Sequence, residues 1–183
     1  MKLFVARHGE TEWNAQNKVC GLTDLCLTET GREQARKLAQ AVRGRGIEVI
    51  LASPLKRAQE TAGIVGEALG LPVETEPLLI EQNYGIYEGV NRFHPDFLAN
   101  KRCFAYRYPG GESMMQVAHR VYGLIDRVRE QYRGRNVLLV CHGGVCRVIN
   151  TYFKDMTNEE FFQYAQGNCE VMEYELPGKE ETP

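Results

Sequence analysis

Short runs of apolar residues alternate along the chain with longer segments in which apolar residues recur every three or four positions. The first pattern is typical of buried strands and the second of amphipathic helices. Helices are expected with Thr28, Ser53 and Ser113 as N-cap residues, and a further helix should follow residues 143–144. Strands are expected at residues 3–6, 47–52, 73–75, 136–141 and 170–176, the last of them at a sheet edge.

This alternation predicts an α/β fold, a three-layer sandwich in which helices cover both faces of a mostly parallel sheet. A single domain is expected over residues 1–176, and residues 177–183 form a polar tail that should be frayed. Residues 77–112 are rich in glycine and proline, which predicts a loop-rich cap insertion with a short helix near residues 95–103. In such sheets ligands bind beyond the carboxyl ends of the strands.

Composition excludes several classes of protein. With 22 basic and 24 acidic residues among 183, the net charge of −2 argues against a nucleic-acid partner. No apolar run reaches the length of a membrane span or of a signal-peptide core, so no membrane partner is expected. Six cysteines without a C-x-x-C motif indicate reduced thiols and a cytoplasmic location. The sequence leaves the oligomeric state open, a homodimer included.

Charged side chains follow three of the predicted strands, at the sheet edge where ligands bind. Arg7 and His8 follow the first strand. Arg57 lies in the segment after the second, and His142 follows the strand at 136–141. Guanidinium groups match the oxygens of a phosphate, and backbone N–H groups at helix starts add affinity for anions. The pattern therefore predicts a cationic pocket for a phosphoryl group, although a sulfate or carboxylate would also fit.

A series of short motifs extends this pattern over residues 3–150. In chain order they are Arg7-His8-Gly9-Glu10-Thr11 with Asn14, Gly21-Leu22-Thr23-Asp24 with Leu27-Thr28-x-x-Gly31, Ser53-Pro54-Leu55-x-Arg57-Ala58-x-x-Thr61-Ala62, Glu81 with Gly85 and Glu88-Gly89, Gly110-Gly111-Glu112-Ser113, and Val140-Cys141-His142-Gly143-Gly144. Six blocks in this order resemble the histidine phosphatase superfamily, the phosphoglycerate-mutase-like proteins. The resemblance implies the phosphoglycerate-mutase-like form of the fold and is closest to the phosphatase branch.

The resemblance also implies a role for each residue in phosphoryl transfer. His8 would be the nucleophile that forms a phosphohistidine, and Glu81 would protonate the leaving-group oxygen and then act as base toward water. Neither a metal nor another cofactor is expected, because guanidinium groups supply the positive charge. The residues implied to clamp the phosphoryl oxygens are Arg7, Arg57 and the catalytic His142, with Asn14 nearby.

The chemistry of His8 agrees with this role. An unperturbed imidazole, with a pKa of about 6.5, is mostly neutral at pH 7. Neighbouring arginines should lower the pKa of His8 further, and donation of its other N–H to a carbonyl would fix the tautomer. Glu10, Glu12 and Glu88 compete with Glu81 for the role of acid.

Two activities remain open within this family. Glu81-x-x-Tyr84-Gly85 and Arg92 resemble the loop in which mutases hold their substrate, so Tyr84 and Arg92 are expected to bind substrate. The cap is shorter than the resemblance implies for true mutases, and a pocket open to water hydrolyses its intermediate. The favoured function is therefore a phosphomonoesterase acting on a small phosphorylated metabolite through a phosphohistidine. A phosphoglycerate mutase-type phosphotransferase is the alternative, and a non-catalytic module that binds phospho-ligands is a third hypothesis.

The cap also carries basic residues interleaved with aromatic ones. Arg92, Lys101, Arg102 and Arg107 alternate with phenylalanines and tyrosines between residues 93 and 108. This pattern fits an ordinary surface lid, and it also fits a cap that reads a second anionic group of the substrate. The second interpretation favours a small phosphorylated metabolite over a phosphoprotein.

Overall fold

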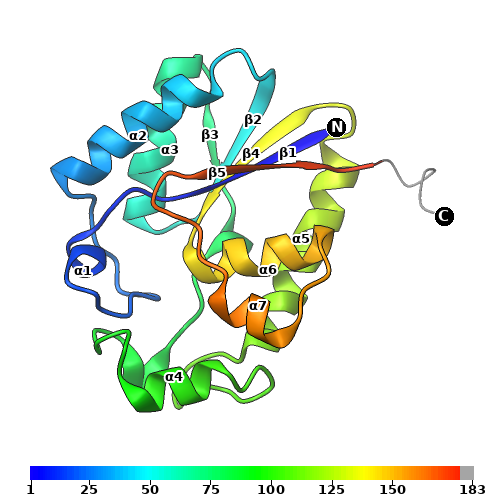
Figure 1. Ribbon diagram of the computed structural model, residues 1–183. Coiled ribbons are helices and arrows are strands. Elements are labelled where there is room, and N and C mark those ends of the chain that lie inside the picture. The colour runs from blue at the N-terminus through cyan, green and yellow to red at the C-terminus, as the bar shows by residue number, and fades with distance from the viewer. Residues whose placement is uncertain (178–183) are drawn as a thin grey trace.

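A five-stranded sheet lies at the centre of the computed structural model, which describes residues 1–177 (Figure 1). The strands lie in the order β3-β2-β4-β1-β5; the first four are parallel, and β5 pairs antiparallel with β1 at the edge. Every predicted strand is confirmed, with the edge position expected for the last. Their bounds are β1 Lys2–Arg7, β2 Ile47–Ala52, β3 Val73–Thr75, β4 Asn136–Cys141 and β5 Val171–Glu175.

Helices cover both faces of the sheet, as the alternation of patterns predicts (Figure 1). Helices α2 (Glu29–Val42) and α3 (Lys56–Leu69) pack on one face, against side chains such as those of Phe4, Ile50 and Leu138. Helices α5 (Met114–Gln131) and α6 (Gly143–Phe153) pack on the other. The three-layer α/β sandwich is therefore confirmed.

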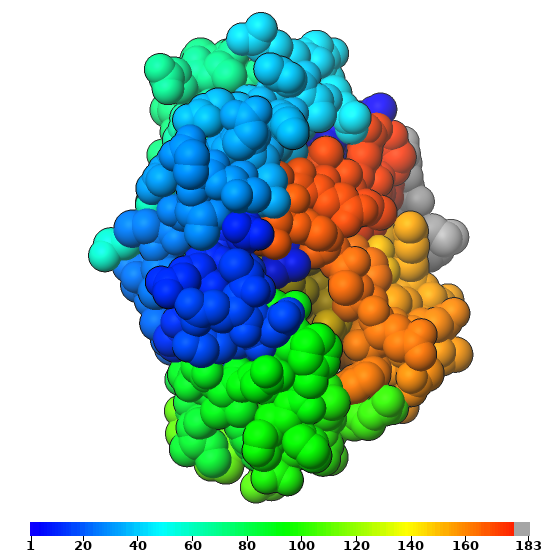
Figure 2. All heavy atoms as spheres, turned by 60° about the vertical axis from the view of Figure 1, so that its left-hand side comes forward, coloured from blue at the N-terminus to red at the C-terminus, as the bar shows by residue number. Residues whose placement is uncertain are grey.

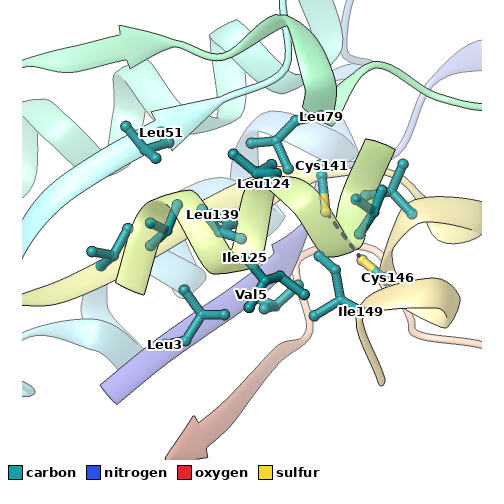
Figure 3. Close-up of a cluster of buried hydrophobic side chains, with 14 of the residues drawn as sticks. Leu3, Val5, Leu51, Leu79, Leu124, Ile125, Leu139, Cys141, Cys146 and Ile149 are labelled. Atoms are coloured by element: carbon teal, nitrogen blue, oxygen red, sulfur yellow. Dashed lines mark hydrogen bonds between the residues drawn. The ribbon is translucent and has the colours of Figure 1, made fainter. Parts of the chain in front are cut away.

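The core strands are apolar along their whole length because successive side chains enter opposite layers. Leu138 belongs to the core under α2 and α3, whereas Leu139 packs against α5 and α6. Figure 3 shows the second of these clusters, in which Leu139 lies beside Ile125. Cys141 also points into this layer, with its Sγ 3.5 Å from that of Cys146.

Two of the predicted N-caps are present and one is wrong. The hydroxyls of Thr28 and Ser113 accept hydrogen bonds from the backbone N–H groups of the first turns of α2 and α5. Helix α3, in contrast, begins at Lys56 after Leu55, without a side-chain cap. The Ser53 hydroxyl accepts from the N–H of Leu55 at 3.4 Å, just before the helix, and lies 2.7 Å from Nε2 of His142, a contact between two strand ends.

Two short helices, α1 (Glu12–Ala15) and α7 (Asn158–Gln163), were not predicted, because four to six residues are too few to establish a helical period. The segment at residues 77–112 contains short 3₁₀ helices at Pro77–Leu79 and Gly85–Tyr87 and the helix α4 (Pro95–Lys101). The expected short helix is thus confirmed.

The cap has a small apolar cluster of its own, separate from the two layers of the sheet. Phe97 and Tyr108 stack with their ring centroids 5.9 Å apart, and Val19 lies with them. The predicted frayed tail falls on residues 178–183, which lie outside the described residues. Within residues 1–177, no helix combines the length and the apolar character needed to cross a membrane.

Two helix glycines provide a matched test of how closely α2 packs against the backbone of Glu10. A Cβ at Gly31 would overlap the carbonyl oxygen of Glu10, whereas a Cβ at Gly63 in α3 would meet nothing within 4 Å. We expect Gly63→Ala to raise the free energy of unfolding by about 0.5–1 kcal/mol, because alanine is the better helix former. Gly31→Ala should lower it by roughly 1–3 kcal/mol through overpacking. Urea denaturation measures both, and equal effects of the two substitutions would contradict the close approach.

Candidate active site

The carboxyl ends of β1, β2 and β4 lie side by side, and each is followed by a polar residue of the site. The backbone N–H of His8 donates to the carbonyl of Cys141, and that of Ser53 donates to the carbonyl of Val140. These bonds continue the strand pairing by one residue and fix where each side chain starts. As a result, the rings of His8 and His142 lie with their centroids 5.1 Å apart.

His8 is buried, and its tautomer is set by the backbone. Its Nδ1 lies 2.7 Å from the carbonyl oxygen of Gly9, and because a carbonyl only accepts, Nδ1 carries the proton. Nε2 therefore holds a free electron pair. Burial first, and then the charges of Arg57 and Arg7, hold the pKa of His8 well below its usual value. The expected direction is correct, but burial contributes more than the arginines do.

Arg7 presents an unpaired donor at this place. Its Nη1 donates to the carbonyl of Gln166 at 2.8 Å, which anchors the guanidinium group. Its Nε is buried and has no partner in the described part of the chain. A Cβ on Gly143, at the start of α6, would lie 3.7 Å from this Nε. Arg7 and the N-terminus of α6 thus face the same space, where an anion would supply the missing acceptor.

Arg57 and His142 are fully buried next to His8. The Nε of Arg57 donates to Nδ1 of His142 at 3.2 Å, and its two Nη atoms donate to the carbonyls of Thr23 and Gly21. Because a guanidinium group has five N–H bonds, two remain free. His142 in turn donates from Nε2 to the Ser53 hydroxyl. Burial, then the charge of Arg57, keeps the pKa of His142 well below its usual value.

A cavity of about 480 Å³ opens in front of His8. Figure 2 shows the surface hollowed here, between the blue N-terminal segment, the green cap and the orange segment that contains α7. Six of the eight predicted site residues line this cavity, whereas Arg57 and His142 lie outside its lining because loop carbonyls and Ser53 hold them. The six are Arg7, His8, Asn14, Glu81, Tyr84 and Arg92.

Glu81 is the carboxylate that reaches this cavity; none of the other described lining residues is acidic. Its Oε2 accepts from the backbone N–H of Gly144 at 3.0 Å, and its Oε1 accepts from that of Gln82 at 2.8 Å. The three competing acids are engaged elsewhere: Glu10 accepts from Thr28, Glu12 from Gln16, and Glu88 from the loop at residues 21–23. Geometry therefore favours Glu81 as the acid.

Asn14 and Tyr84 frame the cavity near His8. The Oδ1 of Asn14 caps α1 by accepting from the N–H of Thr11, and it also accepts from Asn168. Burial, followed by the nearby charge of Glu81, raises the pKa of Tyr84 well above its usual value, so its phenol keeps its proton and can donate. Asn168, which also donates to the backbone carbonyl of His8, was missed because no sequence motif marks it.

The outer wall of the cavity combines basic cap residues that the sequence offered for an anion-reading cap with residues of α6 and α7 that the sequence did not indicate. Lys101 and Arg102 of the cap line it, as the hypothesis of an anion-reading cap requires, but the exposed Arg107 does not. Arg147 of α6 and Phe162 of α7 face these cap residues. Their position follows from packing between distant segments, which a sequence pattern does not report.

Glu88 organises the loop that holds Arg57. Its carboxylate accepts from the backbone N–H groups of Gly21, Leu22 and Thr23 and from the Thr23 hydroxyl. The carbonyls of two of these residues receive Arg57. Glu88 thus positions the guanidinium group through the loop.

We expect Glu88→Gln, which loses one of the two acceptor oxygens, to weaken binding of inorganic vanadate by about tenfold. Isothermal titration calorimetry measures this change. Glu12→Gln, at an exposed glutamate bonded to Gln16, is the matched control and should bind as the wild type does. Unchanged binding by Glu88→Gln would show that Arg57 does not depend on this loop.

Comparison with known proteins gives a consistent picture. The family model of the histidine phosphatase superfamily (branch 1) matches residues 3–182. The probable phosphoglycerate mutase GpmB of Yersinia pestis is 37% identical over 150 residues, which cover 78% of this chain and 70% of the relative. The solved structure of a mycobacterial glucosyl-3-phosphoglycerate phosphatase has 27% identity and a TM-score of 0.83. The match covers 94% of this chain and 88% of that protein. An alpha-ribazole phosphatase from Shigella flexneri has 29% identity and a TM-score of 0.81. The match covers 97% of this chain and 91% of that protein.

Proposed function

The chain belongs to the histidine phosphatase superfamily, branch 1, and on that basis we propose that it is a phosphomonoesterase that hydrolyses a small phosphorylated metabolite through a phosphohistidine. Relatives carry names of both phosphatases and mutases, so phosphoryl transfer is the chemistry they share. The observation that carries the proposal is the shared cavity of His8, Glu81 and Arg7, in which the buried Nε of Arg7 lacks an acceptor. The cytoplasmic location stays a prediction from cysteine usage.

In the first half of the proposed reaction, Nε2 of His8 attacks the phosphorus atom. The P–N bond forms as the bond to the ester oxygen breaks, and Glu81 gives its proton to that oxygen, so the product leaves as a neutral alcohol. Arg7 supplies positive charge to the phosphoryl oxygens, with the N-terminus of α6 beside it. Arg57 would add its two free N–H bonds, and His142 would hold it in place.

In the second half, water attacks the phosphorus atom of the phosphohistidine. Glu81, now a carboxylate, takes one proton from this water as the P–N bond breaks. Inorganic phosphate leaves, His8 recovers its electron pair at Nε2, and Glu81 is again protonated for the next turnover. The proposal needs no metal, because the guanidinium groups carry the cation's role.

A mutase is the second candidate function. It is favoured by the name of the Yersinia relative, a probable phosphoglycerate mutase, and by the position of Tyr84 and Arg92 on the cavity wall. A mutase must keep water from its phosphohistidine until a hydroxyl group accepts the phosphoryl group. We favour hydrolysis because the cavity that His8 lines opens to the surface (Figure 2), so that water can enter it.

The test is a panel of phosphorylated metabolites, assayed for release of inorganic phosphate and for transfer to 3-phosphoglycerate. Each assay is run with and without 2,3-bisphosphoglycerate, which loads a mutase with its phosphoryl group. Phosphate release without bisphosphoglycerate supports the phosphomonoesterase. Isomerisation that requires bisphosphoglycerate supports the mutase, and binding without either reaction supports a non-catalytic module.

A further inference from the structure

The loop that carries Glu81 is attached to a second segment of the cap by backbone contacts. The N–H of Glu112 donates to the carbonyl of Asn83 at 2.8 Å, and the N–H of Asn83 donates to the Glu112 carboxylate at 3.0 Å. The carbonyl of Glu112 also accepts from the side chain of Gln82 at 3.2 Å. A Cβ on Gly111 would lie 2.3 Å from the carbonyl oxygen of Asn83, so the two segments touch backbone to backbone. Glu112 therefore holds the two residues that follow Glu81.

Arg120, a largely buried residue of α5, pairs with that carboxylate. Its Nε lies 3.4 Å from Oε1 of Glu112, and its Nη2 donates to Oε2 at 3.4 Å. Its Nη1 donates to the carbonyl of Leu78, three residues before Glu81, at 2.5 Å. One guanidinium group thus fixes the loop on both sides of Glu81, directly before it and through Glu112 after it.

The carboxyl group of Glu81 has no side chain to hold it. Within residues 1–177, its two hydrogen bonds come from the backbone N–H groups of Gly144 and Gln82. The place of the carboxyl group in the cavity therefore depends on where the backbone of its own loop lies. Arg120 and Glu112 do not line the cavity, so any effect that they have on the reaction must pass through Glu81.

The groups that face the phosphoryl oxygens are held by other parts of the chain. Arg7 is anchored by the carbonyl of Gln166, and His8 by that of Gly9. Arg57 is enclosed by carbonyls of the N-terminal loop. A change at Arg120 or Glu112 should therefore leave these groups in place.

We propose that Arg120 and Glu112 form a brace, a pair of positioning residues that keeps Glu81 where it transfers protons. This inference rests on the proposed function, in which Glu81 acts first as acid and then as base. Without the brace the loop would let the carboxyl group move, and a displacement of about 1 Å can cost about 10²-fold in rate. Loss of the brace should slow proton transfer and leave phosphate binding unchanged.

The experiment compares two esters that differ in their need for an acid. An alkyl phosphate that the wild type hydrolyses, such as glycerol 3-phosphate, needs a proton on its leaving oxygen, whereas p-nitrophenyl phosphate does not. We expect Arg120→Gln to lower kcat for the alkyl phosphate by about 10–100-fold. Release of nitrophenolate in a single turnover, with enzyme in excess, should keep the wild-type rate. The dissociation constant of inorganic vanadate should also stay at its wild-type value.

Arg129→Gln is the matched control for Arg120→Gln. Arg129 lies on the same helix, pairs with Asp126 and has a similar exposed fraction of its side chain, 16% against 13% for Arg120. This variant should process both esters as the wild type does. Arg120→Lys keeps the charge but lacks the planar fork that serves both anchors, so it should recover part of the lost rate.

Two kinetic outcomes would overturn the brace. The first is a wild-type rate of Arg120→Gln with the alkyl phosphate. The second is an equal loss with both esters in a single turnover, because a merely structural defect slows both alike. Thermal unfolding of each variant shows whether it is folded, and Arg120→Lys supplies the same comparison if Arg120→Gln is not.

Hydrogen exchange separates this inference from the proposed function. The N–H of Gly144 lies in the first turn of α6, where the helix offers no acceptor, and Glu81 supplies one. We expect exchange of this amide, followed by ¹H–¹⁵N NMR, to be about tenfold faster in Arg120→Gln. Exchange at Cys146, which bonds to the carbonyl of His142, should not change.

The two readouts fail in different ways. If the wild type hydrolyses no ester, the phosphomonoesterase is rejected, and faster exchange at Gly144 still supports the brace, whereas unchanged exchange rejects it. If the wild type is active and Arg120→Gln equals it with the alkyl phosphate, the brace is rejected and the phosphomonoesterase stays in place.

Discussion

Replacing His8 with alanine should reduce phosphate release by at least about a thousandfold and abolish the phosphorylated enzyme intermediate. In the proposed mechanism the free electron pair at Nε2 is the nucleophile, because Nδ1 is bonded to the carbonyl of Gly9. Alanine removes both atoms and leaves the arginines with a substrate that they bind but cannot cleave. Rapid acid-free quenching with ³²P-labelled substrate measures the intermediate, which should be labile to acid and stable to alkali.

The matched control is His119→Ala, at an exposed position of α5. This variant should form the intermediate and turn over as the wild type does. Circular dichroism and binding of inorganic vanadate show whether His8→Ala keeps its fold and its pocket. Hydrolysis by a folded His8→Ala protein at the rate of the wild type would refute the proposed mechanism.

The sheet could be predicted from the sequence because its strands carry an unusually clear signal. Strands such as β4, from Asn136 to Cys141, are buried on both faces and read as unbroken apolar runs. The start of α3 could not be predicted in the same way. Ser53 before a proline has the local character of an N-cap, but α3 begins only after Leu55, and β4 brings His142 to the Ser53 hydroxyl.

The inner part of the candidate site could be predicted because its motifs are contiguous and lie at strand ends. His8 and Glu81 face one cavity, as expected. The sequence did not show that Arg57 would be enclosed by the carbonyls of Gly21 and Thr23, since a motif gives no side-chain direction. It also did not show Arg147 opposite the cap, because that proximity depends on how α6 and α7 pack.

Glu81 is the residue whose substitution should separate the two halves of the reaction. Both of its oxygens accept backbone N–H groups, from Gly144 and from Gln82, so the carboxyl group is held in place before substrate arrives. An alkyl phosphate needs a proton on its leaving oxygen, because an alkoxide is a strong base. A nitrophenyl phosphate does not, because nitrophenolate leaves unprotonated. In the proposed mechanism, attack of water on the phosphohistidine needs Glu81 as base whatever the substrate was.

We therefore expect Glu81→Gln to lower kcat for glycerol 3-phosphate by about 10²–10⁴-fold. With p-nitrophenyl phosphate the same variant should release a burst of about one nitrophenolate per active site and then stall as phosphohistidine. Stopped-flow absorbance measures the burst, and Glu12→Gln, at an exposed glutamate, should show wild-type kinetics. Equal losses for the two esters with no burst would show that Glu81 is not the proton donor, since a merely structural defect would slow both halves alike.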